Sequence, residues 1–247
     1  MVFNEPNYST SHESSNWNSY EQHKVLVSVE IVLFTIRDGT FEVLLLKRDT
    51  PPFLDFWELP GGLLRMDIGQ RGESTDDAAL RELNKAIGQT GATLRHLEQL
   101  GTYGDPNRDP REERTISIAY MGTGPNLADH QESGGASFLP VHYVREELSD
   151  KIAFDHRGIL KNAISKLKTE IEHSTLATSF CSPTFTMSEL RNVYETILER
   201  KLDPGNFQKK ALSTNGLLKE VDGMNREAAT RGRPAKLYNA GPASNYI

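Results

Sequence analysis

Two stretches decide the fold, WELPGG at residues 57–62 and ESTDDAALRELNKAIG at residues 73–88. In the second stretch, apolar side chains recur at helical spacing behind a Ser74 or Thr75 that can cap a helix. These apolar side chains are Ala79, Leu80, Leu83, Ala86 and Ile87. The stretch therefore predicts one amphipathic helix from about Glu73 to Ile87.

Strands are predicted on both sides of this helix. The apolar, β-branched runs VLVSVEIVLFTI (25–36) and FEVLLLK (41–47) are separated by Asp38-Gly39, which favours a tight hairpin. The long helix HRGILKNAISKLKTEIEH (156–173) repeats apolar residues on one face. Further strands are predicted near 93–101, at TISIAYMG (115–122) and at ASFLPV (136–141). The pattern indicates an α/β domain, an antiparallel or mixed sheet between helices.

The helix and the double glycine resemble the Nudix box, whose pattern is G-x5-E-x7-R-E-U-x-E-E-x-G-U with U an aliphatic residue. Glu73 precedes Arg81-Glu82 at the spacing of the pattern, Leu83 occupies the apolar position, and Gly88 ends the helix where the pattern ends. The resemblance implies a fold in which a sheet lies between helices. The match to the box is partial, because two parts of the sequence differ from the family pattern.

The differences affect the metal site that the resemblance implies. Ten residues separate Gly62 from Glu73 where the family has five, and Lys85 and Ala86 replace the paired glutamates. Glutamates three and four residues apart share one helix face and offer oxygen ligands to Mg²⁺. Only Glu82 of that cluster remains, and Lys85 would bring a positive charge to the place of the cation. We therefore expect no catalytic residue, no bound metal, no cofactor and no hydrolysis.

Two alternatives stay open at this point. An active Mg²⁺-dependent ADP-ribose pyrophosphatase would use Glu73 and Glu82, since hydrolysis of a diphosphate needs a metal that neutralises charge and activates water. Glu82 and Lys85 could also form an exposed helical ion pair without a function.

A Nudix domain without its metal carboxylates can keep a pocket for the substrate class and act as a sensor. Charged and aromatic side chains near strand ends and in the 104–114 loop can contact phosphates or stack on a base. The predicted ligand-binding residues are Arg48, Trp57, Glu58, Glu73, Arg81, Glu82, Lys85, Arg108, Arg114 and His156. As alternatives, Trp57 belongs to the core, Arg108, Arg111 and Arg114 are solvated, and Asp155 caps the helix that begins at His156.

The pattern changes after residue 174. STLATSFCSPTF (174–185) is rich in small polar residues and marks a linker or domain boundary. Met187–Arg200 has helical spacing, and Asp203-Pro204 provides a cap and a first-turn proline for a second helix, NFQKKAL (206–212). The remaining elements are strand LLKEV (217–221), basic loop RGRPA (231–235) and strand KLYNA (236–240). This is the order of a winged helix-turn-helix.

Charge divides between the two parts of the chain. The net charge is −6, yet residues 179–247 carry 10 Lys and Arg against 7 Asp and Glu. In the second helix, Phe207, Ala211 and Leu212 are expected to face the core. Amides can pair with adenine edges, and basic side chains with phosphates or a narrow minor groove. The predicted DNA-binding residues are Asn206, Gln208, Lys209, Lys210, Arg231, Arg233 and Lys236. A protein-interaction module without a DNA target is the alternative.

Taken together, these stretches resemble the NrtR family of Nudix-related transcriptional regulators. The resemblance covers about residues 24–240 and extends beyond the double glycine to both domains. The stretches that carry it are WELPGG (57–62), GTYGDPNRDPREER (101–114), FDH (154–156), ELRNVYETIL (189–198), LDPGNFQKKAL (202–212) and RGRPAKLY (231–238). It implies a homodimer on a palindromic operator, repression of genes of NAD or related metabolism, and ADP-ribose or a similar nucleotide as effector. Some relatives instead respond to sugars.

Composition fits this interpretation. Hydrophobic residues make up 37% and charged residues 25%, and no apolar run approaches the roughly 20 residues of a membrane span. The single cysteine, Cys181, is expected to be structural. The N-terminus lacks the apolar core of a secretory signal, so the expected location is the cytoplasm, without a membrane partner. The predicted organisation is an extension (1–22), a Nudix-like domain (23–176) and a winged helix domain (177–247).

Overall fold

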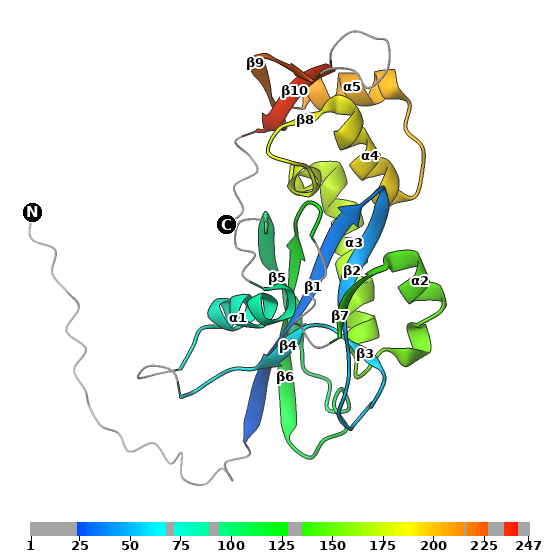
Figure 1. Ribbon diagram of the computed structural model, residues 1–247. Coiled ribbons are helices and arrows are strands. Elements are labelled where there is room, and N and C mark those ends of the chain that lie inside the picture. Colours follow the sequence, from blue (N-terminus) through cyan, green and yellow to red (C-terminus); the bar gives the residue numbers. More distant parts are fainter. Residues whose placement is uncertain are drawn as a thin grey trace, which may run out of the picture.

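Strand β1 (Val25–Arg37) lies at the centre of a mixed sheet in the computed structural model (Figure 1). The structure describes residues 24–67, 72–88, 94–127, 135–214, 216–226 and 235–241, without the side chains of 222–226. The predicted extension 1–22 and the predicted DNA-binding residues Arg231 and Arg233 lie outside the described residues.

Seven strands of the described chain form this sheet, in the order β3-β2-β1-β6-β5, with β4 beside β1 and β7 beside β2. Strand β1 runs parallel to β6 and antiparallel to β2 and β4, so the sheet is mixed. The other strands are β2 (Thr40–Lys47), β3 (Trp57–Glu58), β4 (Gly61–Leu63), β5 (His96–Tyr103), β6 (Arg114–Thr123) and β7 (Ala136–Pro140). Because helices cover both faces, β1 is buried continuously through its middle, which explains its unbroken apolar run.

The predicted hairpin between β1 and β2 is confirmed. Asp38 and Gly39 both have positive φ, 47° and 76°, and Arg37 pairs with Thr40 across the turn. Two consecutive positive φ angles match the right-handed twist of the flanking strands.

Helices lie on both faces of the sheet. Helix α1 (Thr75–Ile87) packs on one face, and its predicted cap is confirmed, since Ser74 Oγ accepts a hydrogen bond from Asp77 N at 3.1 Å. Helices α2 (Val141–Glu146) and α3 (His156–His173) cover the other face, with a short 3₁₀ turn, η2 (Ser149–Lys151), between them. The bounds of α3 are those predicted. None of the described helices combines the length and the apolar character needed to cross a membrane.

The C-terminal part has the predicted order of a winged helix. Its elements are β8 (Phe185–Thr186), α4 (Met187–Leu198), α5 (Pro204–Ser213), β9 (Leu218–Arg226) and β10 (Ala235–Ala240). The three strands form a second sheet in the order β8-β10-β9. Thr186 and Glu189 start α4 with a reciprocal capping box.

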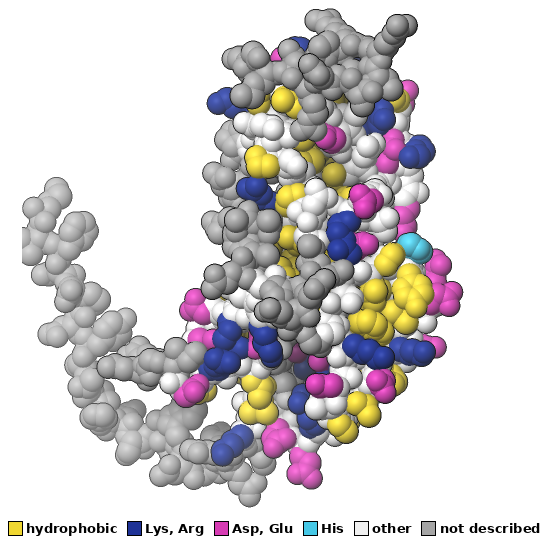
Figure 2. All heavy atoms as spheres, viewed as in Figure 1, with side chains coloured by type: hydrophobic (Ala, Val, Ile, Leu, Met, Phe, Trp, Pro, Cys, Tyr) yellow, Lys and Arg dark blue, Asp and Glu magenta, His cyan; other side chains and the backbone are white. Residues whose placement is uncertain are grey.

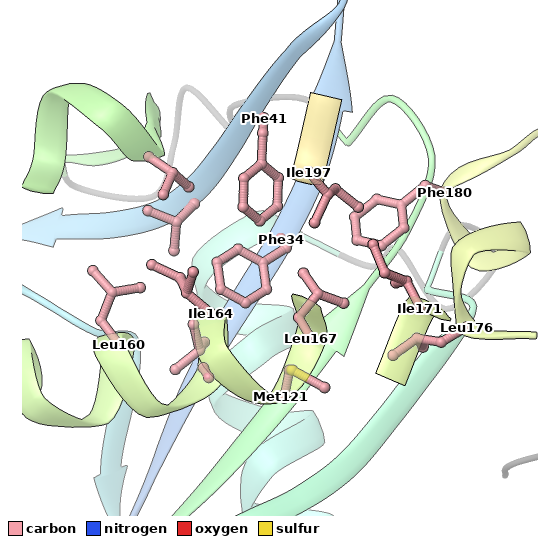
Figure 3. Close-up of a cluster of buried hydrophobic side chains, with 14 of the residues drawn as sticks. Phe34, Phe41, Met121, Leu160, Ile164, Leu167, Ile171, Leu176, Phe180 and Ile197 are labelled. Carbon is pink, nitrogen blue, oxygen red and sulfur yellow. The ribbon is translucent and has the colours of Figure 1, made fainter. Parts of the chain in front are cut away.

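One continuous hydrophobic core joins the two parts. It runs from the large sheet across α3 into α4, β8 and β10, and Figure 3 shows Phe34, Leu167 and Ile197 converging from β1, α3 and α4. The boundary segment 174–185 contributes to it, because it folds as a 3₁₀ helix, η3 (Leu176–Phe180), with four of its five residues buried. The winged helix is therefore packed through apolar contacts on the domain that contains the large sheet.

Candidate functional site

A polar cavity of about 170 Å³ opens where β1 pairs with β4, beside the start of α3. The loop between β5 and β6 closes its other side. Its lining residues include Ser28, Glu30, Arg48, Glu58, Gly61, Gly62, Arg108, Asp109, Arg111, Thr115, Phe154 and His156.

The double glycine brings β4 into this position. A Cβ atom on Gly61 would overlap the carbonyl oxygen of Val29 in β1, and one on Gly62 would overlap the carboxylate of Glu82 in α1. Only glycine permits both approaches, so WELPGG fixes the floor of the cavity against α1.

Two arginines stack on one aromatic ring at the cavity wall. The guanidinium carbons of Arg48 and Arg111 lie 4.9 and 5.3 Å from the centroid of Phe154. Phe154 has a positive φ of 56°, an uncommon conformation for a bulky residue. This local backbone places the ring under both cations, where cation–π attraction favours them.

Each cavity arginine is held by a carboxylate. Arg108 donates two hydrogen bonds to Asp155, at 2.8 and 2.9 Å, and Arg111 donates to Asp109 at 2.5 to 3.0 Å. Arg48 pairs with Glu58. Burial raises the pKa of Glu58, although the hydrogen bond from Arg48 opposes that rise. The guanidinium groups are thus fixed in place before any ligand arrives.

Glu30 is the buried carboxyl of the cavity. Burial raises its pKa to about 7, although Arg108 and the hydrogen bond from Ser28 Oγ, at 3.1 Å, favour the charged form. Near neutral pH, this side chain is therefore divided between its neutral and charged forms.

His156 is neutral in this environment. Leu59 N donates to His156 Nδ1 at 3.0 Å, so the proton is on Nε2, which faces Glu30 Oε1 at 3.8 Å. Burial, with smaller contributions from Arg108 and Arg48, lowers the pKa of His156 to about 3. The cavity thus offers a neutral imidazole N–H donor across the physiological pH range.

The predicted cap of α3 is wrong in one respect. Asp155 occupies the N-cap position, but its side chain makes no capping hydrogen bond. Its carboxylate instead accepts both bonds from Arg108, and this charge-assisted bidentate pair is stronger than a single bond to a backbone N–H.

The structure brings four of the predicted ligand-binding residues into the cavity, namely Arg48, Glu58, Arg108 and His156. The other six lie outside its lining. Trp57 packs against the core and Arg114 donates to the carbonyl oxygen of Gly104 at 2.6 Å. Glu73, Arg81, Glu82 and Lys85 form a separate cluster behind Gly62, which we call the Nudix-helix cluster.

Sequence reasoning missed several cavity residues. Ser28 and Glu30 belong to no recognisable motif, because the alternation of β1 is hidden by its burial on both faces, and in the FDH stretch only His156 is predicted as a ligand contact, not Phe154. Asp109 lies in the 104–114 loop, from which the sequence predicts only arginines as ligand contacts.

The Nudix-helix cluster does not fit a magnesium ion. Arg81 donates to Glu73 at 2.6 and 2.9 Å and also pairs with Glu82, so it holds both carboxylates. These hydrogen bonds lower the pKa of Glu73 to about 2. Lys85 is 3.6 Å from Glu82 as predicted, but its side chain is 77% exposed, and Arg81 occupies the space between the glutamates. Among the described residues, no three His, Cys, Asp or Glu side chains gather as a metal site.

Helix α5 presents the predicted recognition residues. Asp203 Oδ1 accepts from Asn206 N at 2.8 Å, which confirms the predicted start of the helix. Phe207 packs edge-on against Tyr194 of α4, with ring centroids 5.2 Å apart. This contact sets the rotation of α5 and leaves Leu212 52% exposed, so the prediction that Leu212 faces the core is wrong.

The exposed residues of α5 point to two sides. Gln208 and Lys209 are exposed, whereas Asn206 and Lys210, although exposed too, line a groove between α5 and the end of α3. Lys236 on β10 forms an ion pair with Glu220 on β9 at 2.6 Å. Of the predicted DNA contacts, Gln208 and Lys209 are thus oriented away from the rest of the protein.

Comparison with known proteins identifies both halves of the chain. The NUDIX domain family matches residues 26–163, and the NrtR DNA-binding winged helix domain matches residues 178–240.

Three relatives are similar to this chain. The ADPR responsive transcriptional repressor NtrR of Acinetobacter baylyi is 28% identical over 213 residues, which cover 86% of this chain and 81% of the relative. The ADP-ribose pyrophosphatase of Methanocaldococcus jannaschii is 32% identical over 131 residues, covering 51% of this chain and 69% of the relative.

The third relative is NrtR of Shewanella oneidensis. Its structure with a 27mer DNA superposes with a TM-score of 0.74 at 28% identity, covering 88% of this chain and 94% of that one. Its NUDIX domain has also been solved with ADP ribose, with a TM-score of 0.52 at 27% identity over 63% of this chain and 98% of that one. The chain therefore belongs to the Nudix family and is an NrtR-type member, in which a winged helix DNA-binding domain follows the Nudix domain.

Proposed function

We propose that this chain is a transcriptional repressor that binds operator DNA through its winged helix and responds to ADP-ribose or a similar nucleotide in the arginine-lined cavity. The observation that carries the proposal is the position of α3, which begins at the cavity and ends at the winged helix. The relatives from A. baylyi and S. oneidensis, named for an ADPR response and solved with DNA and ADP ribose, support both halves of it.

Helix α3 connects the two sites physically. At its first residue, His156 lines the cavity. Near its last turn, Lys168 binds Glu199 at 2.9 Å and Glu172 binds Arg200 at 2.6 Å, both just beyond the end of α4. An 18-residue helix spans about 27 Å, so a shift at one end reaches the other directly.

The cavity fits part of a nucleotide. Its volume of about 170 Å³ is below the roughly 300–1,000 Å³ of a pocket that encloses a whole ligand. Arg48, Arg108 and Arg111 converge there, and guanidinium groups suit the paired oxygens of a phosphate. We infer that they hold the diphosphate, while the rest of the nucleotide extends along the surface.

The proposed binding to operator DNA is tested by selecting the DNA sequences that the chain binds. The full chain is used to select duplexes from a random pool, and the enriched sequences are measured by gel shift with and without ADP-ribose. An enriched inverted repeat, bound as a homodimer and altered in affinity by ADP-ribose, supports the proposal. A chain that enriches no sequence, even without ligand, is instead a protein-interaction module. Pentoses in the same assay test for a sugar effector.

We infer that Gln208 and Lys209 contact DNA in different ways. Lys209→Ala should weaken binding to all sequences and reduce the slope of log affinity against log salt by about one, as expected for a phosphate contact. Gln208→Ala should cost about 1–3 kcal/mol at the selected operator and little on random DNA, as expected for a base-edge contact. Gel shifts at several salt concentrations separate the two.

A second candidate function is ADP-ribose hydrolysis, favoured by the 32% identity to the M. jannaschii pyrophosphatase. We propose that this chain does not hydrolyse ADP-ribose, because Lys85 and Ala86 replace the paired glutamates of the box and leave only Glu73 and Glu82, both of which are bound to Arg81. Release of AMP from ADP-ribose with Mg²⁺ or Mn²⁺ should stay at background. Turnover that Glu82→Gln abolishes would establish the enzyme instead.

We place its action in the cytoplasm, where a DNA-binding regulator meets its operator. The target genes we propose are those of NAD or related nucleotide metabolism, since an ADP-ribose response would report the turnover of that pool.

A further inference from the structure

A second and larger cavity lies at the junction of the two domains. It measures about 470 Å³, within the range of small-molecule pockets. Its walls come from the end of α3, the C-terminal half of α4, the α4–α5 turn and one side of α5. It contains none of the cavity arginines described above, so the two sites are separate.

The inner walls of this junction cavity are apolar. Tyr194 and Phe207 meet edge-on at 5.2 Å, and Leu198 and Leu202 are half-buried beside them. Such walls favour an apolar body, because its burial removes apolar surface of both partners from water.

The rim of the cavity is polar. Three cations, Arg200, Lys201 and Lys210, and two carboxylates, Glu172 and Asp203, line it. Figure 2 shows basic and acidic side chains interspersed on the visible face of the molecule.

Most of these rim charges already have partners. Arg200 binds Glu172 at 2.6 Å, and Lys201 binds Glu195 at 2.9 Å. Asp203 caps α5. Among the described residues, Lys210 Nζ has neither a hydrogen bond nor an ion pair, although it borders the cavity. One cation is thus available at the edge of an apolar pocket.

We propose that the junction cavity is a second ligand site, which takes a small organic acid with an aromatic or branched apolar body. The acid group binds Lys210, and the body lies against Tyr194 and Phe207. The single available cation selects an anion, and the aromatic wall selects its body. A nucleotide effector is not required at this site.

A ligand in the junction cavity can change DNA binding, because the cavity lies between the two domains. A ligand there touches α3 of the Nudix domain and α5 of the winged helix at once. If its affinity differs between two arrangements of these domains, it shifts their populations and thereby changes the affinity for DNA. The organic acid would be an input independent of the first cavity.

The test uses 8-anilinonaphthalene-1-sulfonate, an aromatic anion whose fluorescence rises in apolar surroundings, titrated against the full chain. We expect saturable binding at one site per chain. Lys210→Gln should weaken it about tenfold, as loss of a charge-assisted hydrogen bond implies. Lys210→Arg should keep most of the affinity. The matched control is Lys209→Gln, which makes the same charge change on the same helix outside the cavity and should alter the affinity less than twofold.

Circular dichroism of each variant confirms that it is folded. The proposal is overturned if no saturable binding occurs, or if the Lys209 and Lys210 variants bind the dye equally. Neither result depends on ADP-ribose or DNA, so failure of this site and failure of the proposed function are distinguishable.

Discussion

The Nudix domain contains two groups of arginines and carboxylates. They differ in how many side-chain nitrogens of the arginines remain without a hydrogen bond. In the Nudix-helix cluster, Arg81 uses all three side-chain nitrogens on Glu73, Glu82 and the carbonyl oxygen of Leu63. In the cavity, Arg108 and Arg111 each use only two nitrogens, and within the described residues their Nη1 atoms make no hydrogen bond.

We infer that this difference favours ligand binding over hydrolysis. At the place of the Nudix metal site, Arg81 pairs with the two glutamates that remain, and Lys85 and Ala86 stand where the family has its paired glutamates. Where a diphosphate would bind, Arg108 and Arg111 are positioned by carboxylates and still have donors for a ligand, whereas Arg48 uses all three side-chain nitrogens on Glu58 and on the carbonyl oxygens of Thr50 and Pro52. A sensor needs the second group and not the first.

The largest expected effect tests the cavity against the cluster directly. Arg108→Gln should weaken ADP-ribose binding about a hundredfold, since truncating one partner of a buried charged pair costs about 2–5 kcal/mol. Arg81→Gln should change the affinity less than twofold, because Arg81 does not line the cavity. Isothermal titration without divalent metal measures both.

Arg108→Lys serves as the graded control for that comparison. It keeps the charge and loses the bidentate geometry, so we expect an intermediate loss of about tenfold. Equal losses in the Arg81 and Arg108 variants would show that the two groups form one site.

The next effect concerns pH. Glu30, with its pKa raised to about 7 by burial, is neutral at pH 6 and mostly charged at pH 8. A charged Glu30 repels the diphosphate, whose own charge is constant in this range. ADP-ribose affinity should therefore fall about tenfold from pH 6 to pH 8, one pKa unit being a factor of ten.

Glu30→Gln isolates that effect. The variant should bind ADP-ribose equally well at both pH values and match the wild type near pH 6. His156 cannot produce the dependence, because its pKa of about 3 keeps it neutral throughout. A wild-type affinity that rises with pH would contradict the assignment to Glu30.

Local signals made much of the fold predictable. The helix at 156–173, the Asp38-Gly39 hairpin and the caps at Ser74 and Asp203 depend on residues close in sequence, and all are confirmed. The rotation of α5 is different, because it is set by a contact between Phe207 and Tyr194 that no local pattern encodes. This is why the sequence pattern predicts the wrong side of the helix for Leu212.

The cavity was less predictable for the same physical reason. Arg108 and Asp155 are separated by 47 residues, and only the fold brings them together and removes Asp155 from its capping role. The raised pKa of Glu30 results from burial in β1, which the sequence of a strand covered on both faces does not reveal. The sequence therefore predicts several of the residues that line the cavity, but it does not predict which residues they pair with in the folded chain.

The smallest expected effect concerns Lys85, the residue that stands where the family has a glutamate. Its side chain is 77% exposed and 3.6 Å from Glu82, an arrangement that contributes little in water. Lys85→Glu should therefore change ADP-ribose affinity less than twofold, measured beside Lys85→Gln as the neutral control. The substitution also restores one acidic residue of the box but leaves Ala86 in place of the other, so hydrolysis with Mg²⁺ should stay at background. A large loss of affinity in Lys85→Glu, with Lys85→Gln unchanged, would mean that the bound nucleotide reaches around Gly62 to α1 and that the two groups act on one ligand.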